Sequence, residues 1–300
     1  MRYHDLYKSG ELLLRIREAY ARLRSCDLCP HCCGVNRLAG DSGFCRAGIK
    51  PKIASANLHR GEEPPISGTR GSGTIFFSHC TLQCLFCQNF PISQMGNGEE
   101  ATTSELAAQW LKLQRLGAHN INFVTPGHYL PQILAALWLA IPQGFSLPLV
   151  WNSSGYETVE ALRLLDGIVA VYLPDMKYAE QQPAVRYSAA PRYPEYNRLA
   201  VLEMFRQVGH LTVDNAGIAV KGLIIRHLVL PENNAGSLVT LRWIAENLGS
   251  ETHIALMNQY FPAHQAFETP GIYRKITDEE YAEAVEALED FGLENGWVQD

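Results

Sequence analysis

Residues 73–89 read GTIFFSHCTLQCLFCQN and join an apolar run to three cysteines. The run GTIFFS is rich in β-branched and aromatic residues, which is typical of a buried strand. Cys80, Cys84 and Cys87 follow it with the spacing C-x3-C-x2-C. If the strand belongs to a parallel α/β fold, this loop lies at the carboxyl end of the strand, where such folds carry out their chemistry.

Apolar strands alternate with amphipathic helices along the rest of the chain. This alternation requires parallel pairing through right-handed crossovers. Two architectures satisfy it, an open doubly wound sheet and a barrel of fewer than eight units, and the pattern does not separate them. We expect strands at residues 73–80, 121–124, 147–152, 168–173, 221–230 and 253–258, and helices at residues 11–24, 104–117, 130–140, 158–165, 195–209 and 237–248.

Capping residues mark the ends of two helices. Ser104 is expected as the N-cap of the helix that follows the cysteine loop, and Gly117 as the residue after its end. Thr277 and Glu280 have the spacing of a capping box, which predicts a final helix through residue 291.

The composition describes a folded chain with a mildly acidic charge. Of its 300 residues, 47% are hydrophobic and 19% are charged, which favours a packed core over disorder. The net charge of -6 gives no electrostatic footprint for a phosphate backbone, so nucleic acid is disfavoured as the main partner. The N-terminus lacks the apolar core of a signal peptide, and Pro142, Gln143 and Gly144 interrupt the most apolar stretch. We therefore expect a cytoplasmic protein without a membrane span.

The three cysteines of the loop match the ligand set of a cubane iron–sulfur cluster. Thiolates at Cys80, Cys84 and Cys87 can hold three irons and leave the fourth iron without a protein ligand. S-adenosylmethionine (SAM) can chelate that open iron, and the cluster can then pass one electron into the sulfonium group. Two other interpretations are three buried cysteines without a metal and a zinc site completed by His79.

A second group of cysteines lies in residues 25–71, which contain many glycines and prolines and no long periodic apolar run. Such a segment buries little core, so it needs a metal or the main domain to order it. Four thiolates here suit either zinc or an auxiliary iron–sulfur cluster. Neighbouring side chains point apart, so Cys32 and Cys33 are not expected to bind one metal together. The other candidate ligands are Cys26, Cys29 and Cys45.

These residues resemble a known enzyme superfamily. The C-x3-C-x2-C loop, with Phe86 just before its last cysteine, resembles the loop of the radical SAM enzymes. The chain from about residue 26 to 275 is similar to homologues of the pyruvate formate-lyase activating enzyme. The stretches that carry the likeness are CGVNRLAGDSGFC (33–45), CTLQCLFCQN (80–89), INFVTPGHYLP (121–131), WNSSGYETVEAL (151–162), YLPDMKY (172–178), IRHLVLP (225–231) and LMNQYFP (256–262).

The resemblance implies an α/β fold, a partial (β/α)6 TIM-type barrel with a cysteine-rich N-terminal segment. We expect residues 1–70 to form an N-terminal helix and the metal-binding segment, residues 71–265 the barrel, and residues 266–300 a helical extension. The resemblance also implies an oxidoreductase or lyase with a [4Fe-4S] cluster and SAM as cofactors. Such an enzyme cleaves SAM to a 5′-deoxyadenosyl radical, which abstracts hydrogen from a substrate. The expected electron donor is a reduced flavodoxin or ferredoxin. The resemblance suggests a glycyl radical protein as the substrate, and a peptide or a small molecule is the alternative.

Several cofactor-binding residues follow from the resemblance, position by position. Phe86 is expected to shield the cluster, and Asn89 to lie near the adenine edge. Asn152 and Ser153 align with a polar pair that helps to bind the methionyl carboxylate region in the activating enzymes. From the residues alone, this pair fits equally well as turn residues before Gly155.

Asp175 and Lys177 match an Asp-x-Lys pair of the activating enzymes. Two residues apart on an extended segment, their side chains point the same way, although a solvated pair at a strand end has the same pattern. The chain departs from the family at residues 125–128, TPGH, where a Gly-Gly-Glu motif is expected to hold the methionine amino group. Thr125 or backbone carbonyl groups are the candidates for that task here.

An alternative from another class is a zinc-binding module that recognises a protein or nucleic acid. It would use Cys26, Cys29, Cys33 and Cys45, and the barrel would be a scaffold; the family-like CGVNR stretch selects Cys33 over Cys32. The acidic charge and the position of the other cysteine group at a strand end favour the enzyme. Three histidines near strand ends or the loop are interpreted as structural: His79, His128 and His227.

Overall fold

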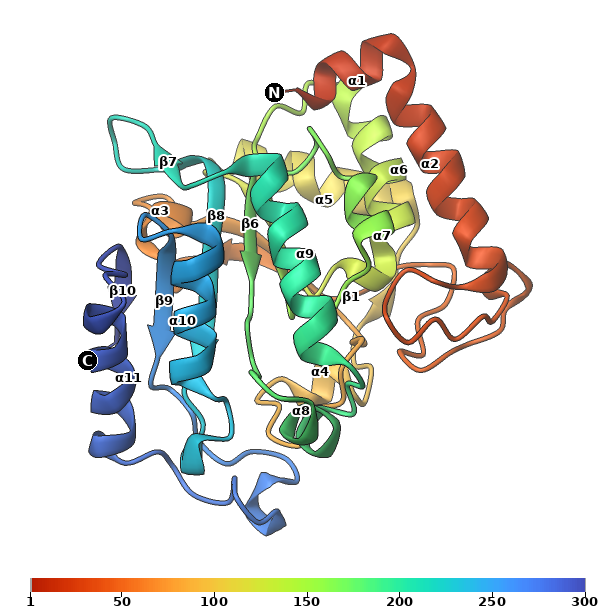
Figure 1. Cartoon of the computed structure of the whole chain (residues 1–300). Helices are drawn as coiled ribbons and strands as arrows, with labels where there is room; N and C mark the ends of the chain where they lie inside the picture. Colours follow the sequence, from red (N-terminus) through yellow and green to blue (C-terminus); the bar gives the residue numbers. More distant parts are fainter. Residues whose placement is uncertain (1, 300) are drawn as a thin grey trace.

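The computed structural model describes residues 2–299, which build one open, mostly parallel sheet (Figure 1). The strands lie in the order β10-β9-β8-β6-β5-β4-β2-β1-β3, and β7 pairs with β8 beside this path. In chain order the strands are β1 (Lys52–His59), β2 (Ser72–Phe77), β3 (Glu99–Glu100), β4 (Ile121–Val124), β5 (Leu149–Ser153), β6 (Val171–Pro174), β7 (Thr212–Val213), β8 (Ala219–Leu228), β9 (His253–Met257) and β10 (Gly296–Val298).

Most of the longer helices cover the outer face of this sheet (Figure 1). Within residues 2–299, no helix combines the length and the apolar character that crossing a membrane requires. In chain order the helices are α1 (Tyr3–Ser9), α2 (Glu11–Ala21), α3 (Pro64–Ser67), α4 (Phe90–Ser93), α5 (Thr103–Arg115), α6 (Leu130–Ala140), α7 (Val159–Arg163), α8 (Gln181–Ser188), α9 (Tyr193–Val208), α10 (Ser237–Leu248) and α11 (Asp278–Asp290).

The expected partial barrel is confirmed. The six strands predicted from the alternation are β2, β4, β5, β6, β8 and β9, and each is parallel to its neighbour. The sheet does not close on itself, because β1 and β3 end one edge and β10 ends the other. Parallel strands place all their carboxyl ends on one side, so the loops after them meet there.

The sheet extends beyond the six expected strands at both edges. At one edge β1, within residues 25–71, pairs antiparallel with β2. Every residue of β1 is half-buried or exposed, so its sequence KIASANLH shows no clean alternation of apolar and polar residues. At the other edge β10 pairs parallel with β9, although only three residues form it. The three-part division of the chain remains a prediction.

The helix-end predictions succeed in two places and fail in one. Gly117 follows the end of α5 with a left-handed φ of 89°, and Thr277 and Glu280 form the expected capping box of α11. Ser104 is not the N-cap of α5, because Thr102 takes that position. The hydroxyl of Thr102 accepts the Glu105 amide, and the Glu105 carboxylate accepts the Thr102 amide in return. This reciprocal pair satisfies two helix-end donors, which Ser104 cannot do.

The segment between β1 and β2 fills the interior of the partial barrel. It contains the short helix α3, and Ile66 of that helix is completely buried. Ile66 packs in one cluster with apolar side chains of β5, β6 and β8. Glu62 and Glu63 immediately precede α3, so this packing holds both carboxylates beside the inner face of the sheet.

Candidate active site

The cysteine loop begins where β2 ends, as the sequence predicts. Cys80, Cys84 and Cys87 are half-buried, and each sulfur has a hydrogen-bond partner. Hydrogen bonds of this kind stabilise the thiolate form that binds iron. The partners are the Leu82 amide for Cys80 (3.3 Å), the Ser188 hydroxyl for Cys84 (3.0 Å) and the Ser93 hydroxyl for Cys87 (3.1 Å).

Burial makes two of these thiols weak acids. It raises the pKa of Cys80 well above its usual range, and the neighbouring Cys84 adds to the effect. Burial also raises the pKa of Cys84 to about 11, although the Lys177 ammonium opposes this shift. Buried thiolates therefore need positive charge beside them. A metal bound by the loop would supply it, since metal binding drives off the thiol proton.

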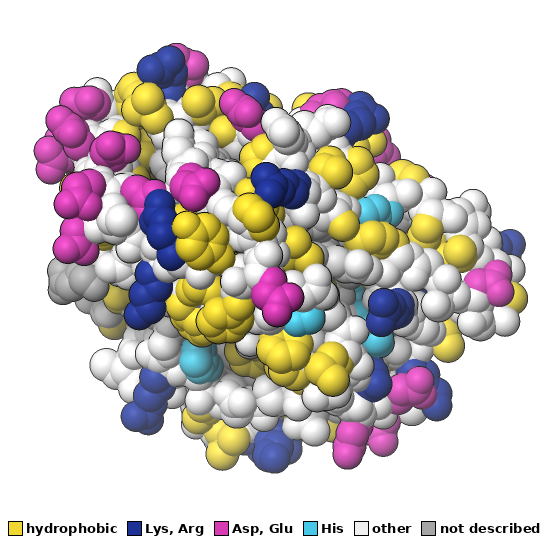
Figure 2. Space-filling model, turned by 90° about the horizontal axis from the view of Figure 1, so that it is seen from below, with side chains coloured by type: hydrophobic (Ala, Val, Ile, Leu, Met, Phe, Trp, Pro, Cys, Tyr) yellow, Lys and Arg dark blue, Asp and Glu magenta, His cyan; other side chains and the backbone are white. Residues whose placement is uncertain are grey.

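The loop forms one wall of a cavity of about 680 Å³ at the carboxyl ends of the parallel strands. Figure 2 shows the lower side of the molecule, where hydrophobic side chains gather near the middle and most acidic side chains lie toward the edges. Phe86 does not line the cavity; it is buried, with its ring centroid 5.6 Å from that of Tyr260. Every other cofactor-binding residue predicted for the cluster site lines it: Asn89, Thr125, Asn152, Ser153, Asp175 and Lys177.

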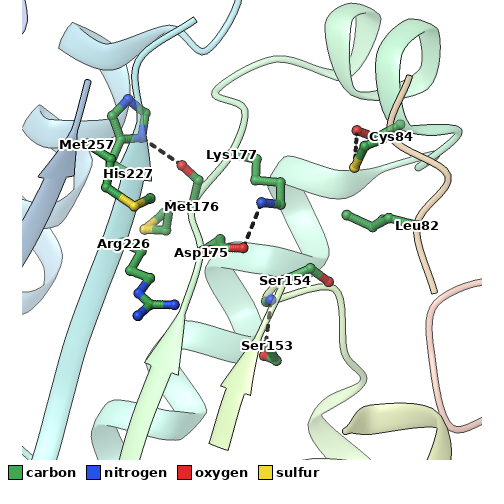
Figure 3. A network of polar contacts seen from close by, with 12 residues as sticks. Leu82, Cys84, Ser153, Ser154, Asp175, Met176, Lys177, Arg226, His227 and Met257 are labelled. Atoms are coloured by element: carbon green, nitrogen blue, oxygen red, sulfur yellow. Dashed lines mark hydrogen bonds and ion pairs between the residues drawn. The ribbon is translucent and has the colours of Figure 1, made fainter. Parts of the chain in front are cut away.

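Asp175 and Lys177 form an ion pair inside this cavity and are not a solvated pair. Their N···O distance is 2.7 Å, and each side chain is 19% exposed. Burial acts to lower the pKa of Lys177, but the Asp175 carboxylate and the thiolate form of Cys84 outweigh it and raise the pKa above its usual range. Figure 3 shows the Lys177 amine beside Asp175, on the side that faces Cys84. A positive charge therefore stands next to the cysteine loop.

The backbone beneath this ion pair is held by buried polar side chains of α9. The Asn197 amide donates to the Asp175 carbonyl (2.9 Å), and the Tyr193 hydroxyl donates to the same carbonyl (3.1 Å). The Lys177 amide in turn donates to the Tyr193 hydroxyl (3.0 Å). These contacts fix the direction in which the two charged side chains leave the end of β6.

Thr125 and Asn152 come from neighbouring strand ends. The Thr125 amide donates to the Asn152 carbonyl (2.8 Å). Thr125 has a φ of 57°, a left-handed conformation that costs a β-branched residue about 1–2 kcal/mol. The structure thus keeps a strained residue on the cavity wall at the position where the family motif is absent.

The N-terminal cysteines lie beside the cluster loop but not in its cavity. The ring of His31 is 2.9 Å from the Thr81 carbonyl, which joins the segment to the loop. Cys45 and Cys80 also border the same small cavity of about 20 Å³. The predicted N-terminal site is therefore close to the predicted cluster site.

These cysteines differ in burial. Cys26 and Cys29 are buried, whereas Cys32 and Cys33 are exposed. Burial raises the pKa of Cys29 well above its usual range, and Cys45 contributes further because it lies near. Within residues 2–299, no three His, Cys, Asp or Glu side chains already surround a point as the ligands of one metal ion. Metal binding by the N-terminal cysteines stays a prediction.

The histidines interpreted as structural include two with clear structural contacts. His227 is fully buried between the Met176 carbonyl (2.7 Å) and the Ser237 hydroxyl (2.9 Å), and burial lowers its pKa to about 4. His128 is buried against the Ser78 carbonyl (2.9 Å), and burial lowers its pKa to about 3. Both rings are neutral at physiological pH.

Comparison with known proteins places this chain in a family. It is 33% identical to the uncharacterized protein MJ0674 of Methanocaldococcus jannaschii over 302 residues, which cover 97% of this chain and 83% of MJ0674. The chain belongs to the MJ0674 family. No model of a known protein family matches the sequence.

Solved structures show which fold this member of the MJ0674 family has. The X-ray structure of the FeFe-hydrogenase maturase HydG from Carboxydothermus hydrogenoformans matches with a TM-score of 0.51 and 14% identity, over 73% of this chain and 51% of HydG. Another HydG crystal structure matches with a TM-score of 0.50 and 14% identity, over 78% and 53%. This likeness shows that the chain has a TIM-barrel-like α/β fold similar to that of the radical SAM enzymes. It spans about half of the HydG chain.

The structure adds polar residues that the sequence pattern did not reveal in this MJ0674-family protein. Glu157 is buried and accepts hydrogen bonds from the Trp151 indole (2.8 Å) and the Ser153 hydroxyl (2.7 Å). Burial raises the pKa of Glu157 to about 7, although both hydrogen bonds oppose the shift. Arg226 is a charged residue within the apolar strand β8, and this position in the sequence could have indicated a buried polar contact. Glu62 and Glu63 gave none, because they precede a four-residue helix.

Proposed function

We propose that this protein is a radical SAM enzyme. One observation carries the proposal: three thiols at the spacing C-x3-C-x2-C line the same cavity as an Asp175–Lys177 ion pair, at the carboxyl ends of a radical SAM fold. Three thiols suit a [4Fe-4S] cluster with one open iron better than zinc, which takes four protein ligands in a structural site.

In this proposal, Cys80, Cys84 and Cys87 hold the cluster. Bound there, the cluster supplies one electron that breaks a carbon–sulfur bond of SAM, and the resulting 5′-deoxyadenosyl radical abstracts hydrogen from the substrate. Lys177 places an ammonium beside the thiolates, where it reduces the free energy of holding several negative charges in a buried loop.

The remaining wall of the cavity is proposed to bind SAM. Asn152 and Ser153 are assigned to the region of the methionyl carboxylate. The Ser153 hydroxyl donates its hydrogen bond to Glu157 at 2.7 Å, so the Asn152 amide is the side-chain group proposed to donate to the carboxylate. Thr125 is the residue that we propose for the methionine amino group, because it lines the cavity where the family motif is absent. Asn89 is assigned to the adenine edge, and Phe86 is buried behind the loop.

We further propose the activating-enzyme-like subgroup, with a glycyl radical protein as the hydrogen donor and a reduced flavodoxin or ferredoxin as the electron donor. The likeness of the segments quoted above supports this assignment. Fold alone does not set the substrate, because one fold serves many reactions.

The test of the proposed function is anaerobic reconstitution with iron and sulfide. We expect a brown protein with iron–sulfur absorption that makes 5′-deoxyadenosine from SAM when dithionite is added. A colourless protein that binds zinc and makes no 5′-deoxyadenosine would support the zinc-binding module instead.

We also propose that Cys26, Cys29, Cys33 and Cys45 bind a second metal that orders the N-terminal segment. Elemental analysis of a variant with Cys80, Cys84 and Cys87 all changed to Ala tests this. Retained zinc indicates a structural site, because zinc forms a closed tetrahedron. Retained iron and sulfide indicate an auxiliary cluster. A folded variant that retains neither contradicts the proposal.

A further inference from the structure

The cavity continues past the proposed cofactor site to a second end. Four residues on neighbouring strands are partners in register. They are Asp175 at the end of β6, Arg226 on β8, Ala255 on β9 and Trp297 on β10. Register partners on parallel strands point to the same face of a sheet, so these side chains form one row. All of them line the cavity. Figure 3 shows that Arg226 lies on the far side of Asp175 from Cys84.

Ala255 leaves space in the middle of this row. Ala255 is on β9, between Arg226 on β8 and Trp297 on β10. The backbones of β8 and β10 are about 9–10 Å apart, which is twice the distance between neighbouring strands. A larger residue at this position would close the gap. The row therefore holds a recess with an arginine on one side and an indole on the other.

Two carboxylates from the opposite wall meet Arg226. Glu63 binds the guanidinium through both of its oxygens, at 2.6 and 2.8 Å, and Glu62 binds it through Oε2 at 2.5 Å. The Glu62 and Glu63 side chains are only 5% and 7% exposed. These paired charges lie in a medium of lower dielectric constant than water. Any unbalanced charge there therefore interacts more strongly with a charged ligand than it would in water.

The charges here do not balance. Glu62 and Glu63 face one arginine, and Asp175 already has Lys177 as its partner. Glu62 Oε1 has no hydrogen-bond partner within residues 2–299, and it is not one of the buried unsatisfied atoms there. It is therefore an acceptor open to the cavity that Glu62 lines. This accessible oxygen can accept a hydrogen bond from a ligand in the cavity, and the unbalanced negative charge favours a cationic donor.

We propose that the recess between Glu62 and Trp297 binds an alkylammonium or guanidinium group of the substrate. Glu62 Oε1 accepts its hydrogen bond and balances its charge, and the Trp297 indole supplies a face that attracts cations. The two carboxylates and the one guanidinium together carry a net negative charge, which disfavours an anionic group in the recess. The inference rests on the proposed function, because it makes this recess the substrate end of the SAM cavity.

Calorimetric titration of the anaerobically reconstituted protein, saturated with SAM, tests this proposal. The probes are butylguanidinium, butylammonium and the neutral isostere butylurea. In a second arm, acetyl-Gly-Arg-Gly-amide is compared with its citrulline counterpart. We expect either the free cations or the arginine peptide to bind at least about tenfold more tightly than the neutral partner. The arm that binds identifies a small-molecule or a peptide source of the cation.

Glu62→Gln should remove most of this preference, whereas Glu246→Gln, an exposed change on the outer helix α10, should leave it intact. If Glu62→Gln does not fold, Trp297→Leu serves instead, and it should weaken cation binding severalfold by removing the indole face. Three results would overturn the inference. The charged and neutral probes bind equally, neither arm shows binding, or the preference for cations persists in both Glu62→Gln and Trp297→Leu.

The same samples separate this inference from the proposed function. Wild-type protein that makes 5′-deoxyadenosine but shows no cation preference contradicts only the substrate site. Wild-type protein that prefers cations but never cleaves SAM contradicts the proposed function.

Discussion

Glu157 shows how burial alone can change the behaviour of one carboxyl group. Its pKa is raised from 4.5 to about 7, so the folded protein binds a proton here that the unfolded chain has lost. The stability that this proton provides is complete below about pH 4.5 and is lost as the pH rises through about 7. The loss is on the order of 3 kcal/mol, since each pKa unit is worth about 1.4 kcal/mol.

We therefore predict that Glu157→Gln flattens the pH dependence of stability. Gln cannot ionise, so the variant should lose less unfolding free energy than the wild type between pH 5 and pH 8. Urea unfolding at several pH values, followed by circular dichroism, measures this. An unchanged slope would mean that Glu157 titrates normally in the folded protein.

Asp175 is predicted to act on SAM binding through its ion pair with Lys177, which is 2.7 Å away. Asp175→Ala leaves the ammonium without its carboxylate partner in a half-buried site. We expect SAM to bind about tenfold more weakly while the protein stays folded. Equilibrium dialysis with labelled SAM gives the affinity. Asp290→Ala, an exposed change at the end of α11, is the control and should bind like the wild type.

Individual site residues were predictable where the signal was local. Cys80, Cys84 and Cys87 stand within eight residues and follow a strand, so the sequence predicted that they lie together at the end of that strand. The contact between Glu63 and Arg226 joins residues 163 positions apart. No local pattern contains such a pair, because it depends on how the segment before α3 enters the barrel.

At the scale of elements, the start of α5 provides a prediction with an internal control. Thr102→Ala removes the hydroxyl that accepts the Glu105 amide at 3.1 Å. We expect a loss of about 1 kcal/mol in unfolding free energy, which is typical of an N-cap change. Ser104→Ala should change stability by less than about half of that, because Ser104 lies inside the first turn. Urea denaturation ranks the two, and a larger loss for Ser104→Ala would contradict the assigned cap.

The long parallel strands and their helices were predictable, whereas the edges of the sheet were not. Each central strand is an apolar run bounded by helical periodicity, which is a strong signal. β10 has only three residues, Gly296–Val298, and its pairing with β9 comes from packing of the chain end. Yet Trp297 in this strand lines the cavity, so a weakly encoded element contributes to the site.

At the scale of the whole molecule, the cavity joins segments from nearly the full length of the chain, from His59 to Gln299. The sequence predicted its position, because parallel strands gather their carboxyl ends on one side. The family resemblance also predicted Lys177 near the cysteine loop, but nothing in the sequence predicted the two carboxylates at the other end. This distribution of charge requires the register of β6, β8, β9 and β10.

The most direct test of the central claim is the formation of 5′-deoxyadenosine by three anaerobically reconstituted proteins. We expect the wild type to form it from SAM and dithionite, and Cys84→Ala to form none above the protein-free control. Cys32→Ala should match the wild type, since Cys32 is exposed and belongs to neither proposed ligand set. Product formation by Cys84→Ala at the wild-type rate would contradict the claim that this loop holds the catalytic cluster.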